Sequence, residues 1–202
     1  MSELILASTS VYRRELLSRL RLPFSVESPQ VDERPQPHET PARLAERLAL
    51  EKAWAVARRH PAAWVIGADQ VADLAGRPLG KPGDHAAAVA QLRAQSGREV
   101  QFYTAVAVVR AQVGFARSAL TTVGVRFRTL DEAAIQTYLR LDRPYDCAGS
   151  AKCETLGIAL LERVVSDDPT ALVGLPLIAT TQLLCAAGLD PLAALAEAGG
   201  VA

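Results

Sequence analysis

The chain has few cysteines, and they are not arranged for cross-linking or for metal binding. There are three, at positions 147, 153 and 185, with no Cys-x-x-Cys spacing and no histidine cluster beside them. An odd, scattered set argues against a disulfide framework and against a zinc site. Because free thiols persist in a reducing compartment, we expect a cytoplasmic protein.

An excess of charge of either sign is also lacking. The 22 basic residues balance the 22 acidic residues, and no long block of like charge occurs. Proteins whose main ligand is duplex DNA or RNA usually carry a basic face that neutralises several phosphates. We therefore expect no nucleic-acid partner, whereas a small anion is compatible with a local cluster of positive side chains.

Long apolar runs are absent as well. Nowhere do enough apolar residues follow one another to cross a bilayer, and no basic stretch precedes the first apolar run. We expect neither a membrane span nor an export signal. Half of the residues are nevertheless apolar, and strands alternate with helices, which predicts a single α/β domain over residues 1–202 with a mixed sheet. The Ala- and Gly-rich tail from about residue 190 is predicted to be flexible.

The stretch 65–71 is the part around which the rest is organised. Its sequence Val-Ile-Gly-Ala-Asp-Gln-Val predicts a short buried strand that carries Asp69 and Gln70 at its end. Gly80-Lys81-Pro82 follows on a nearby loop, where glycine and proline constrain the backbone that carries the lysine. A carboxylate and a cation on neighbouring turns indicate the reaction centre of a nucleotide-hydrolysing enzyme.

Two predicted helices beside this strand each carry a cation on an apolar face. In the first, Arg13 falls within the arc of leucines 16, 17 and 20; in the second, which begins at Thr40-Pro41 and runs to about residue 59, Lys52 falls within the arc of positions 44, 48, 55 and 56. A buried cation needs an anionic partner. Either each cation forms an internal salt bridge, or the two share a bound anion. Ser8, just before the first helix, is either part of an ordinary cap or a phosphate ligand.

The remaining segments complete the predicted pattern. We expect strands at 3–7 and 24–27, a loop at 29–41, a helix at 84–95, a hairpin of 100–110 with 117–128, a helix at 129–141 opened by a capping box, a binding loop at 144–154, a strand at 156–165 and a last helix at 174–188. Leu50 and Trp54 lie off the apolar stripe of the second helix. They are either a subunit contact or isolated exposed side chains.

Six separated motifs resemble those of the Maf-like family of nucleoside triphosphate pyrophosphatases. They are Leu6–Arg13, Val31–Glu33, Glu51–Ala53, Ile66–Gln70, Gly80–Pro82 and Gly174–Pro176. The resemblance implies an elongated α/β fold, a mixed sheet flanked by helices, related to that of inosine triphosphatases, and a homodimer. It also implies cleavage of a nucleoside triphosphate between its α and β phosphates with a divalent metal, Mg²⁺ or Mn²⁺.

The same resemblance implies a role for each matched side chain. The phosphate contacts are Ser8, Arg13, Lys52 and Lys81, the proton acceptor is Asp69, and the metal ligands are Glu33 and Asp69. Asp69 is suited to deprotonating a water, and the cations neutralise phosphate charge. Glu33 by itself would be read as a solvated loop acid.

The choice of branch depends on fewer residues. Gln70 together with the loop 147–154 resembles the branch that acts on 7-methyl-GTP, in which the positions numbered here Tyr12, Gln70 and Glu154 set specificity. The carboxylate of Glu154 accepts hydrogen bonds and fits the donor pair on the Watson–Crick edge of guanine. Tyr12 offers a face on which a cationic methylated base can stack. The chain departs from the expected pattern at Tyr12, Ala151, Cys153 and Thr155.

Two alternatives stay open at this point. The first is a pyrophosphatase of dTTP and UTP, against which Gln70 and Glu154 count, because the pyrimidine branches tend to carry Thr and Gln at these positions. The second is a nucleotide-binding regulator of cell division that acts through a protein partner, a role attached to the family. Asp69 counts against it, since a pure binder gains nothing from an acid that faces an anionic phosphate.

Overall fold

The frame of the molecule is a seven-stranded mixed sheet. The computed structural model describes residues 3–199. The strands are β1 (Leu4–Ala7), β2 (Ser25–Glu27), β3 (Trp64–Leu74), β4 (Arg77–Leu79), β5 (Glu99–Arg110), β6 (Phe115–Phe127) and β7 (Leu161–Val165). Their order is β2-β1-β3-β5-β6-β7, with β4 beside β3. β1 runs parallel to β2 and β3, and the other pairs are antiparallel, so the predicted α/β class with a mixed sheet is confirmed.

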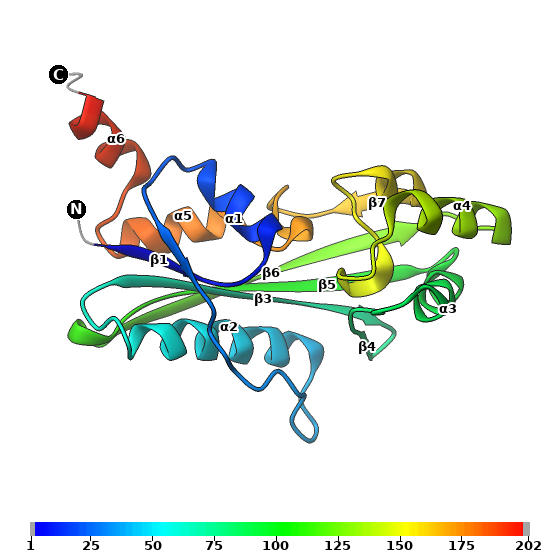
Figure 1. Ribbon diagram of the computed structural model, residues 1–202, viewed down its shortest axis with the longest axis horizontal. Helices are drawn as coiled ribbons and strands as arrows, with labels where there is room; N and C mark the ends of the chain where they lie inside the picture. Colours follow the sequence, from blue (N-terminus) through cyan, green and yellow to red (C-terminus); the bar gives the residue numbers. More distant parts are fainter. Residues whose placement is uncertain (1–2, 200–202) are drawn as a thin grey trace.

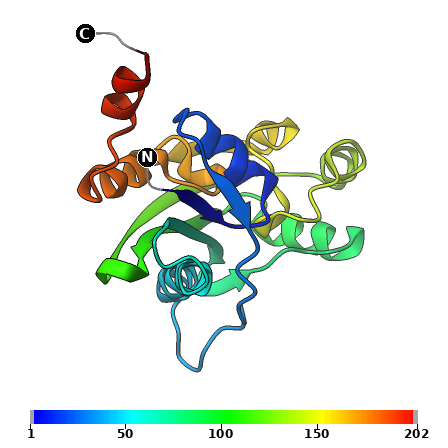
Figure 2. The same ribbon diagram turned by 60° about the vertical axis from the view of Figure 1, so that its left-hand side comes forward.

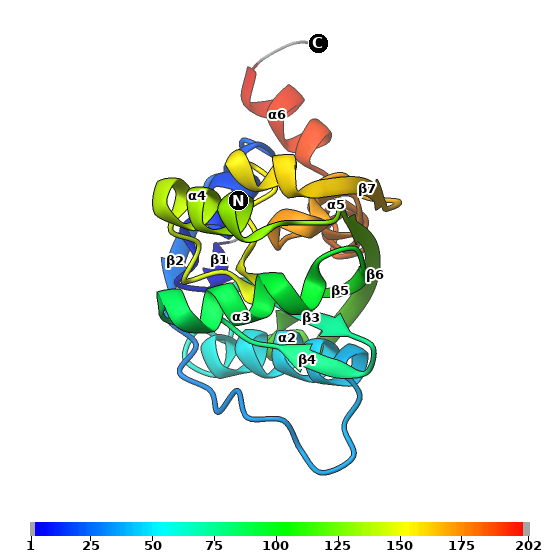
Figure 3. The ribbon, with the colours of Figure 1, turned by 90° about the vertical axis from the view of Figure 1, so that its right-hand side faces the viewer.

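Helices cover both faces of the sheet and one of its ends. α1 (Val11–Ser18) and α5 (Leu177–Ala186) lie on one face, and α2 (Pro41–Ala57) lies on the other and is seen almost end-on in Figure 2. α3 (His85–Gln95) and α4 (Glu132–Asp142) pack together at one end of the long strands (Figure 3). Because β3, β5 and β6 run along the longest axis, the molecule is elongated (Figure 1).

Local sequence explains most of the helix starts. Thr40 and Asp84 stand at the predicted starts of α2 and α3 and cap them, each accepting a hydrogen bond from a first-turn amide. For α4 the cap is Asp131, which accepts from the amide of Ala134, and not Thr129 at the start of the predicted capping box. Gly114, at φ 64°, ends the short 3-10 helix η1 (Ala111–Val113) that joins β5 to β6.

The period-two alternation of the strands divides the core between the two faces. Along β3, Val65 packs in the cluster under α2, whereas Ile66 and Ala68 pack in the cluster under α1 and α5. A third apolar cluster, which contains Phe102 and Phe127, joins the sheet to α3 and α4. Successive side chains of β3 therefore serve different layers of the molecule.

Three elements differ from the prediction. β3 does not end at Asp69 but continues to Leu74, because it pairs with β5 from Val65 to Asp73. The predicted strand at 156–165 starts as the 3-10 helix η3 (Leu156–Leu160) and is a strand only in β7. Position 55, predicted to be buried in the apolar stripe of α2, is half-buried, and the stripe is filled instead by alanines such as Ala53.

The end of the described chain forms one more helix. The tail expected to be flexible continues as helix α6 (Pro191–Gly199), which projects from the body in Figure 1, while positions 200–202 lie outside the described residues. Between residues 3 and 199, no single helix is long and apolar enough to cross a membrane. α5 and α6 meet that length and composition only as a pair, and they are bent by 67° to each other.

Candidate active site

The candidate site lies where one edge of β3 is left open. One edge of the strand pairs with β5 along most of its length. On the other edge, β1 pairs with residues 64–67 and β4 with residues 72–74. Among the described strands, none pairs with residues 68–71 on that side. The edge beside Asp69 and Gln70 is therefore open, between the end of β1 and the start of β4.

A cleft of about 960 Å³ occupies this position. All nine residues that the sequence predicts line it: Ser8, Tyr12, Arg13, Glu33, Lys52, Asp69, Gln70, Lys81 and Glu154. They come from the β1–α1 turn, α1, the loop before α2, α2 itself, β3, the loop after β4 and the loop before η3. The expected binding loop at 144–154 also contributes to the wall, through Asp146 and Ala148 among others.

The centre of the cleft is an ammonium group held between two carboxylates. Nζ of Lys52 lies 2.6 Å from Oδ1 of Asp69 and 2.7 Å from Oε1 of Glu33. Lys52 and Asp69 are buried, whereas the Glu33 side chain is 60% exposed. The cation that the sequence places on the apolar face of α2 thus has an internal partner, as the salt-bridge interpretation requires, and it still lines the cleft.

At each of the two acids, burial and the neighbouring positive charges act on the pKa in opposite directions. Burial raises the pKa of Asp69 above its ordinary value, although the nearby charges of Lys52 and Arg13 act to lower it. At Glu33 burial also acts to raise the pKa, but the hydrogen bond and charge of Lys52, with Lys81 and Arg13, outweigh it, so the pKa is lowered. Asp69 is therefore the better proton acceptor near neutral pH, and Glu33 stays ionised.

The other predicted phosphate contacts are partly engaged by the protein. Nε of Arg13 donates to the carbonyl oxygen of Gly174 at 2.9 Å, and burial lowers the pKa of its guanidinium. Within residues 3–199 the terminal nitrogens of Arg13 make no hydrogen bond, which leaves them for a ligand. Ser10, not Ser8, caps α1, and the hydroxyl of Ser8 accepts from the amide of Ser10 at 3.1 Å. Lys81 is exposed on its loop.

The three predicted specificity residues differ in how far their side chains are already engaged by other parts of the protein. Nε2 of Gln70 lies within 3.0 Å of the carbonyl oxygens of Ala171 and Leu172, so this side chain is fixed. The hydroxyl of Tyr12 lies 3.3 Å from Asp146, and Nζ of Lys152 lies 5.6 Å from the centre of its ring. One face of Tyr12 is thus covered, and a base must stack on the other. Glu154 is exposed on the cleft wall.

Sequence reasoning missed Arg47, which fixes the loop that carries Glu33. Its guanidinium lies 2.7 Å from Glu39 and 3.0 Å from Glu51, and it donates to the backbone carbonyl of Arg34 at 3.1 Å. The contact with Glu51, four residues further along α2, could be predicted from the sequence spacing. The contacts with Glu39 and with the carbonyl of Arg34 could not, because they cross the loop. The hydrogen bonds from Arg47 lower the pKa of Glu39 to about 2.

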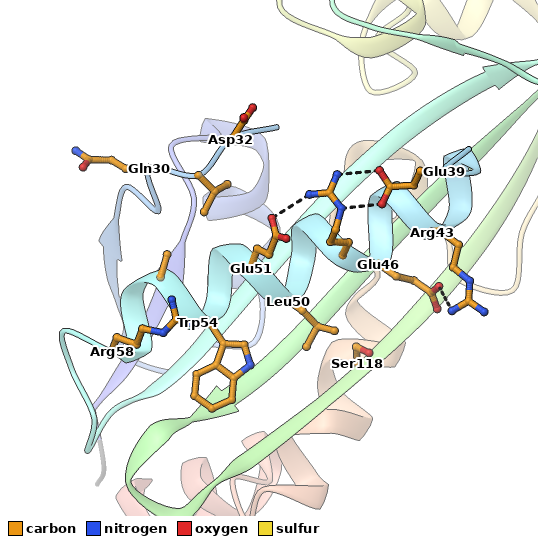
Figure 4. A pocket seen from close by; sticks show the side chains of 13 residues that line it. Gln30, Asp32, Glu39, Arg43, Glu46, Leu50, Glu51, Trp54, Arg58 and Ser118 are labelled. Atoms are coloured by element: carbon orange, nitrogen blue, oxygen red, sulfur yellow. Dashed lines mark hydrogen bonds and ion pairs between the residues drawn. The ribbon is translucent and has the colours of Figure 1, made fainter. Parts of the chain in front are cut away.

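A second hollow follows the outer side of α2. Figure 4 shows Leu50 and Trp54 there, near the pairs made by Glu39 and Glu51. None of the nine predicted residues lines this hollow, which, among residues 3–199, shares only Gln30 and Val31 with the lining of the cleft.

The carboxylates of the cleft can bind a divalent cation such as Mg²⁺ only if a bound substrate and water supply the remaining oxygen ligands. In the part of the chain from residue 3 to residue 199, no group of three or more His, Cys, Asp or Glu side chains could hold a metal. Glu33 and Asp69 flank the same ammonium and supply two carboxylates. One or two carboxylates completed by substrate phosphates and water form a set that Mg²⁺ accepts. The residues present therefore fit such an ion.

We expect the acid limb of the pH–activity profile to depend on Lys52. A base is active when deprotonated, so activity falls as the pH drops through its pKa. The positive charge of Lys52 lowers the pKa of Asp69, so Lys52→Met should move the limb of the residual activity up by about 1–3 pH units. The measurement is kcat/KM against pH. In Lys81→Met, whose charge acts on Glu33, the limb should stay in place.

A buried acid, an ammonium between two carboxylates and further cations around one cleft define a site suited to hydrolysing an anionic substrate. Comparison with known proteins is in line with this class: the sequence model of the family described as Maf-like protein matches residues 3–187. The chain belongs to the Maf-like protein family.

Relatives within the family are similar over nearly their whole length. The 7-methyl-GTP pyrophosphatase of Polaromonas sp. (strain JS666 / ATCC BAA-500) is 64% identical over 185 residues, which cover 92% of this chain and 84% of that protein. The protein of the same name from Albidiferax ferrireducens is 58% identical, covering 95% and 96%, and that from Bordetella pertussis is 59% identical, covering 94% of each.

Solved structures are more distant. The Ham1 protein of Staphylococcus aureus superposes with a TM-score of 0.45 at 18% identity, over 62% of this chain and 71% of that one. A Ham1 protein from Coxiella burnetii gives a TM-score of 0.44 at 16% identity, over 63% and 73%.

Proposed function

We propose that this protein hydrolyses 7-methyl-GTP to 7-methyl-GMP and pyrophosphate. The observation that carries the proposal is the cleft at the open edge of β3, where the buried Asp69 lies beside Lys52 and the same cleft is also lined by Arg13 and Lys81. A triphosphate carries several negative charges, and this arrangement provides both the cations to bind it and a carboxylate to activate water. The names of the similar proteins support the choice of substrate.

This proposal assigns a role to each predicted charged group of the cleft. Asp69 accepts a proton from a water molecule, whose oxygen attacks the α phosphorus. The bond from that phosphorus to the bridging oxygen of the β phosphate then breaks, and pyrophosphate leaves with the bond's electron pair. Arg13, Lys52 and Lys81 stabilise the charge on the phosphate oxygens, and Ser8 donates its hydroxyl to one of them. A divalent ion, Mg²⁺ or Mn²⁺, held by Glu33 and Asp69, supplies further charge neutralisation when bound.

In the same proposal, three further residues of the cleft recognise the base. Glu154 and Oε1 of Gln70 are acceptors, and they match the two donors on the Watson–Crick edge of guanine. The free face of Tyr12 stacks on the base, whose positive charge after methylation at N7 adds a cation–π attraction of about 0.5–2 kcal/mol.

The direct test is hydrolysis of 7-methyl-GTP, GTP, dTTP and UTP side by side, with Mg²⁺, with Mn²⁺ and with chelator. We expect the highest kcat/KM for 7-methyl-GTP, pyrophosphate among the products and no turnover with chelator. A preference for dTTP and UTP would replace this proposal with the pyrimidine alternative. Binding without turnover under every condition would favour the regulator.

Glu154→Gln should reduce base selectivity. The amide keeps the shape of the side chain but replaces an acceptor by a donor that faces the donors of guanine. Losing a hydrogen bond to a charged group costs about 1.5–3 kcal/mol, so the ratio of kcat/KM for 7-methyl-GTP over UTP should fall by about 10–100-fold. An unchanged ratio would remove Glu154 from base recognition.

We further propose that the enzyme is a cytoplasmic homodimer with residues 1–202 as one domain. Free cysteines at 147, 153 and 185 are compatible with a reducing compartment. Leu50 and Trp54, which line the hollow outside α2 (Figure 4), are two apolar side chains that a subunit contact could bury there. Sedimentation of the full chain at several concentrations tests the dimer, and Trp54→Glu tests the contact.

A further inference from the structure

Asp168 is a buried carboxylate for which the mechanism above has no use. It is 3% exposed. Oδ1 accepts hydrogen bonds from the amide of Thr170 at 2.9 Å and from its hydroxyl at 2.7 Å, and Oδ2 accepts from the amide of Ile178 at 2.7 Å. Its described hydrogen-bond partners, between residues 3 and 199, are thus amides and a hydroxyl of its own segment, and no cation pairs with it.

The contacts of Asp168 close the segment 168–178 on itself. α5 begins after Pro176, whose side chain makes no capping hydrogen bond. Asp168 instead caps the helix through the amide of Ile178, ten residues further along the chain. The hydroxyl of Thr170 lies 2.8 Å from the carbonyl oxygen of Leu175 and accepts from the amide of Leu177 at 2.8 Å. The carboxylate therefore fixes both ends of the turn that contains the 3-10 helix η4 (Ala171–Val173) and Gly174.

This turn presents three carbonyl oxygens to two side chains of the cleft. Gly174 accepts from Nε of Arg13 at 2.9 Å. Ala171 and Leu172 each accept from Nε2 of Gln70 at 3.0 Å. Because both acceptors are carbonyls, the amide nitrogen of Gln70 must face the turn, and only its oxygen is available to a ligand. The turn sets the direction of one cation and the hydrogen-bonding character of one amide.

We propose that Asp168 is a positioning residue that acts through the turn 171–174 on both Arg13 and Gln70, and so couples phosphate binding to base selection. The inference rests on the proposed function of the cleft. If Asp168 were only a helix cap, its loss would affect neither substrate binding nor selectivity. The inference predicts that loss of Asp168 both weakens binding of the phosphate chain and reduces the preference for a base that presents hydrogen-bond donors.

Asp168→Asn tests the inference. The amide has one acceptor where the carboxylate has two, so an N–H group must face either Ile178 or Thr170. In the full chain we expect the Kd for inorganic triphosphate, measured by calorimetry, to rise by about tenfold, the loss of one hydrogen bond to a charged group. The ratio of kcat/KM for 7-methyl-GTP over UTP should fall by a similar factor.

Two further variants separate positioning from stability. Ile135→Val removes one buried methylene from the core at α4; it should lower thermal stability and leave both readouts unchanged. Thr170→Val, which removes the hydroxyl, should reproduce both losses. Thr170→Ser, which keeps the hydroxyl, should have the triphosphate affinity and the selectivity of the wild type. If Asp168→Asn does not fold, the Thr170 pair decides by the same two readouts.

The outcomes are distinct. Unchanged triphosphate affinity and selectivity in folded Asp168→Asn, or in Thr170→Val, would reduce Asp168 to a structural cap and overturn the inference. If the wild-type chain shows no preference for 7-methyl-GTP, the part of the proposed function that concerns base selectivity is wrong. The inference is then judged by triphosphate affinity alone, which needs no turnover.

Discussion

Asp69→Asn is expected to lower kcat by about 10²–10⁴-fold, the usual contribution of a positioned general base. The amide has the same shape as the carboxylate but cannot accept the proton of the attacking water. Since the Asp69 carboxylate faces an anionic substrate, its neutralisation should not weaken the binding of inorganic triphosphate when no divalent metal is present. The fold should survive, because Lys52 keeps Glu33 as an anionic partner at 2.7 Å.

Asp73→Asn is the matched control. Asp73 lies four residues further along β3, on the same face of the sheet, and it is not among the residues that line the cleft. We expect its turnover to equal that of the wild type. The measurement is steady-state kinetics with 7-methyl-GTP, together with circular dichroism of both variants. Full turnover in Asp69→Asn would exclude this residue as the base.

The largest expected effect on stability comes from Gly67→Ala. An added Cβ would fall within contact distance of the carbonyl oxygen of Ala49 and 2.6 Å from the amide nitrogen of Ala53, both in the backbone of α2. Backbone atoms cannot rotate away as a side chain can, so α2 must move off the sheet. Overpacking costs about 1–3 kcal/mol and occasionally more, and we expect a loss in the free energy of unfolding of about 3 kcal/mol.

That loss corresponds to a fall in Tm of about 6–12 °C for a chain of this size. The control is Gly80→Ala, where an added Cβ meets nothing within 4 Å; it should leave Tm almost unchanged. The same displacement of α2 also separates Lys52 from Asp69, so Gly67→Ala should lose turnover at temperatures where it is still folded. A Tm within a degree or two of the wild type would show that α2 can shift without cost.

Short-range chemistry accounts for the parts of the fold that the sequence predicts well. The caps at Thr40 and Asp84 involve residues three apart, and the apolar periods of α1 and α2 locate the buried faces. The same periods identify Lys52 as an inward-facing cation before any contact is known. The motifs of the resemblance indicate Glu33, whose position relative to Lys52 depends on a loop of irregular shape.

Contacts between distant segments account for what was missed. β3 continues past Asp69 because β5 pairs with it, and this pairing leaves no mark within residues 70–74 themselves. From the sequence, Asp168 would be assigned to a turn before Pro169. Its role as a helix cap follows only from the hydrogen bond that the amide of Ile178 donates to it. Arg47 similarly looks like a surface residue of α2 until the loop that it holds is placed.

Asp69 and Gln70 are neighbours in the chain, yet their side chains project to opposite sides of the sheet, toward α2 in one case and toward the turn 171–174 in the other. A change at position 70 therefore alters the surroundings of the nucleobase without disturbing the pair formed by Asp69 and Lys52. Mutational libraries confined to position 70 should therefore yield enzymes with new base preferences and undiminished hydrolytic chemistry. Insertion of a single residue between positions 67 and 69 would exchange the two sides and abolish both.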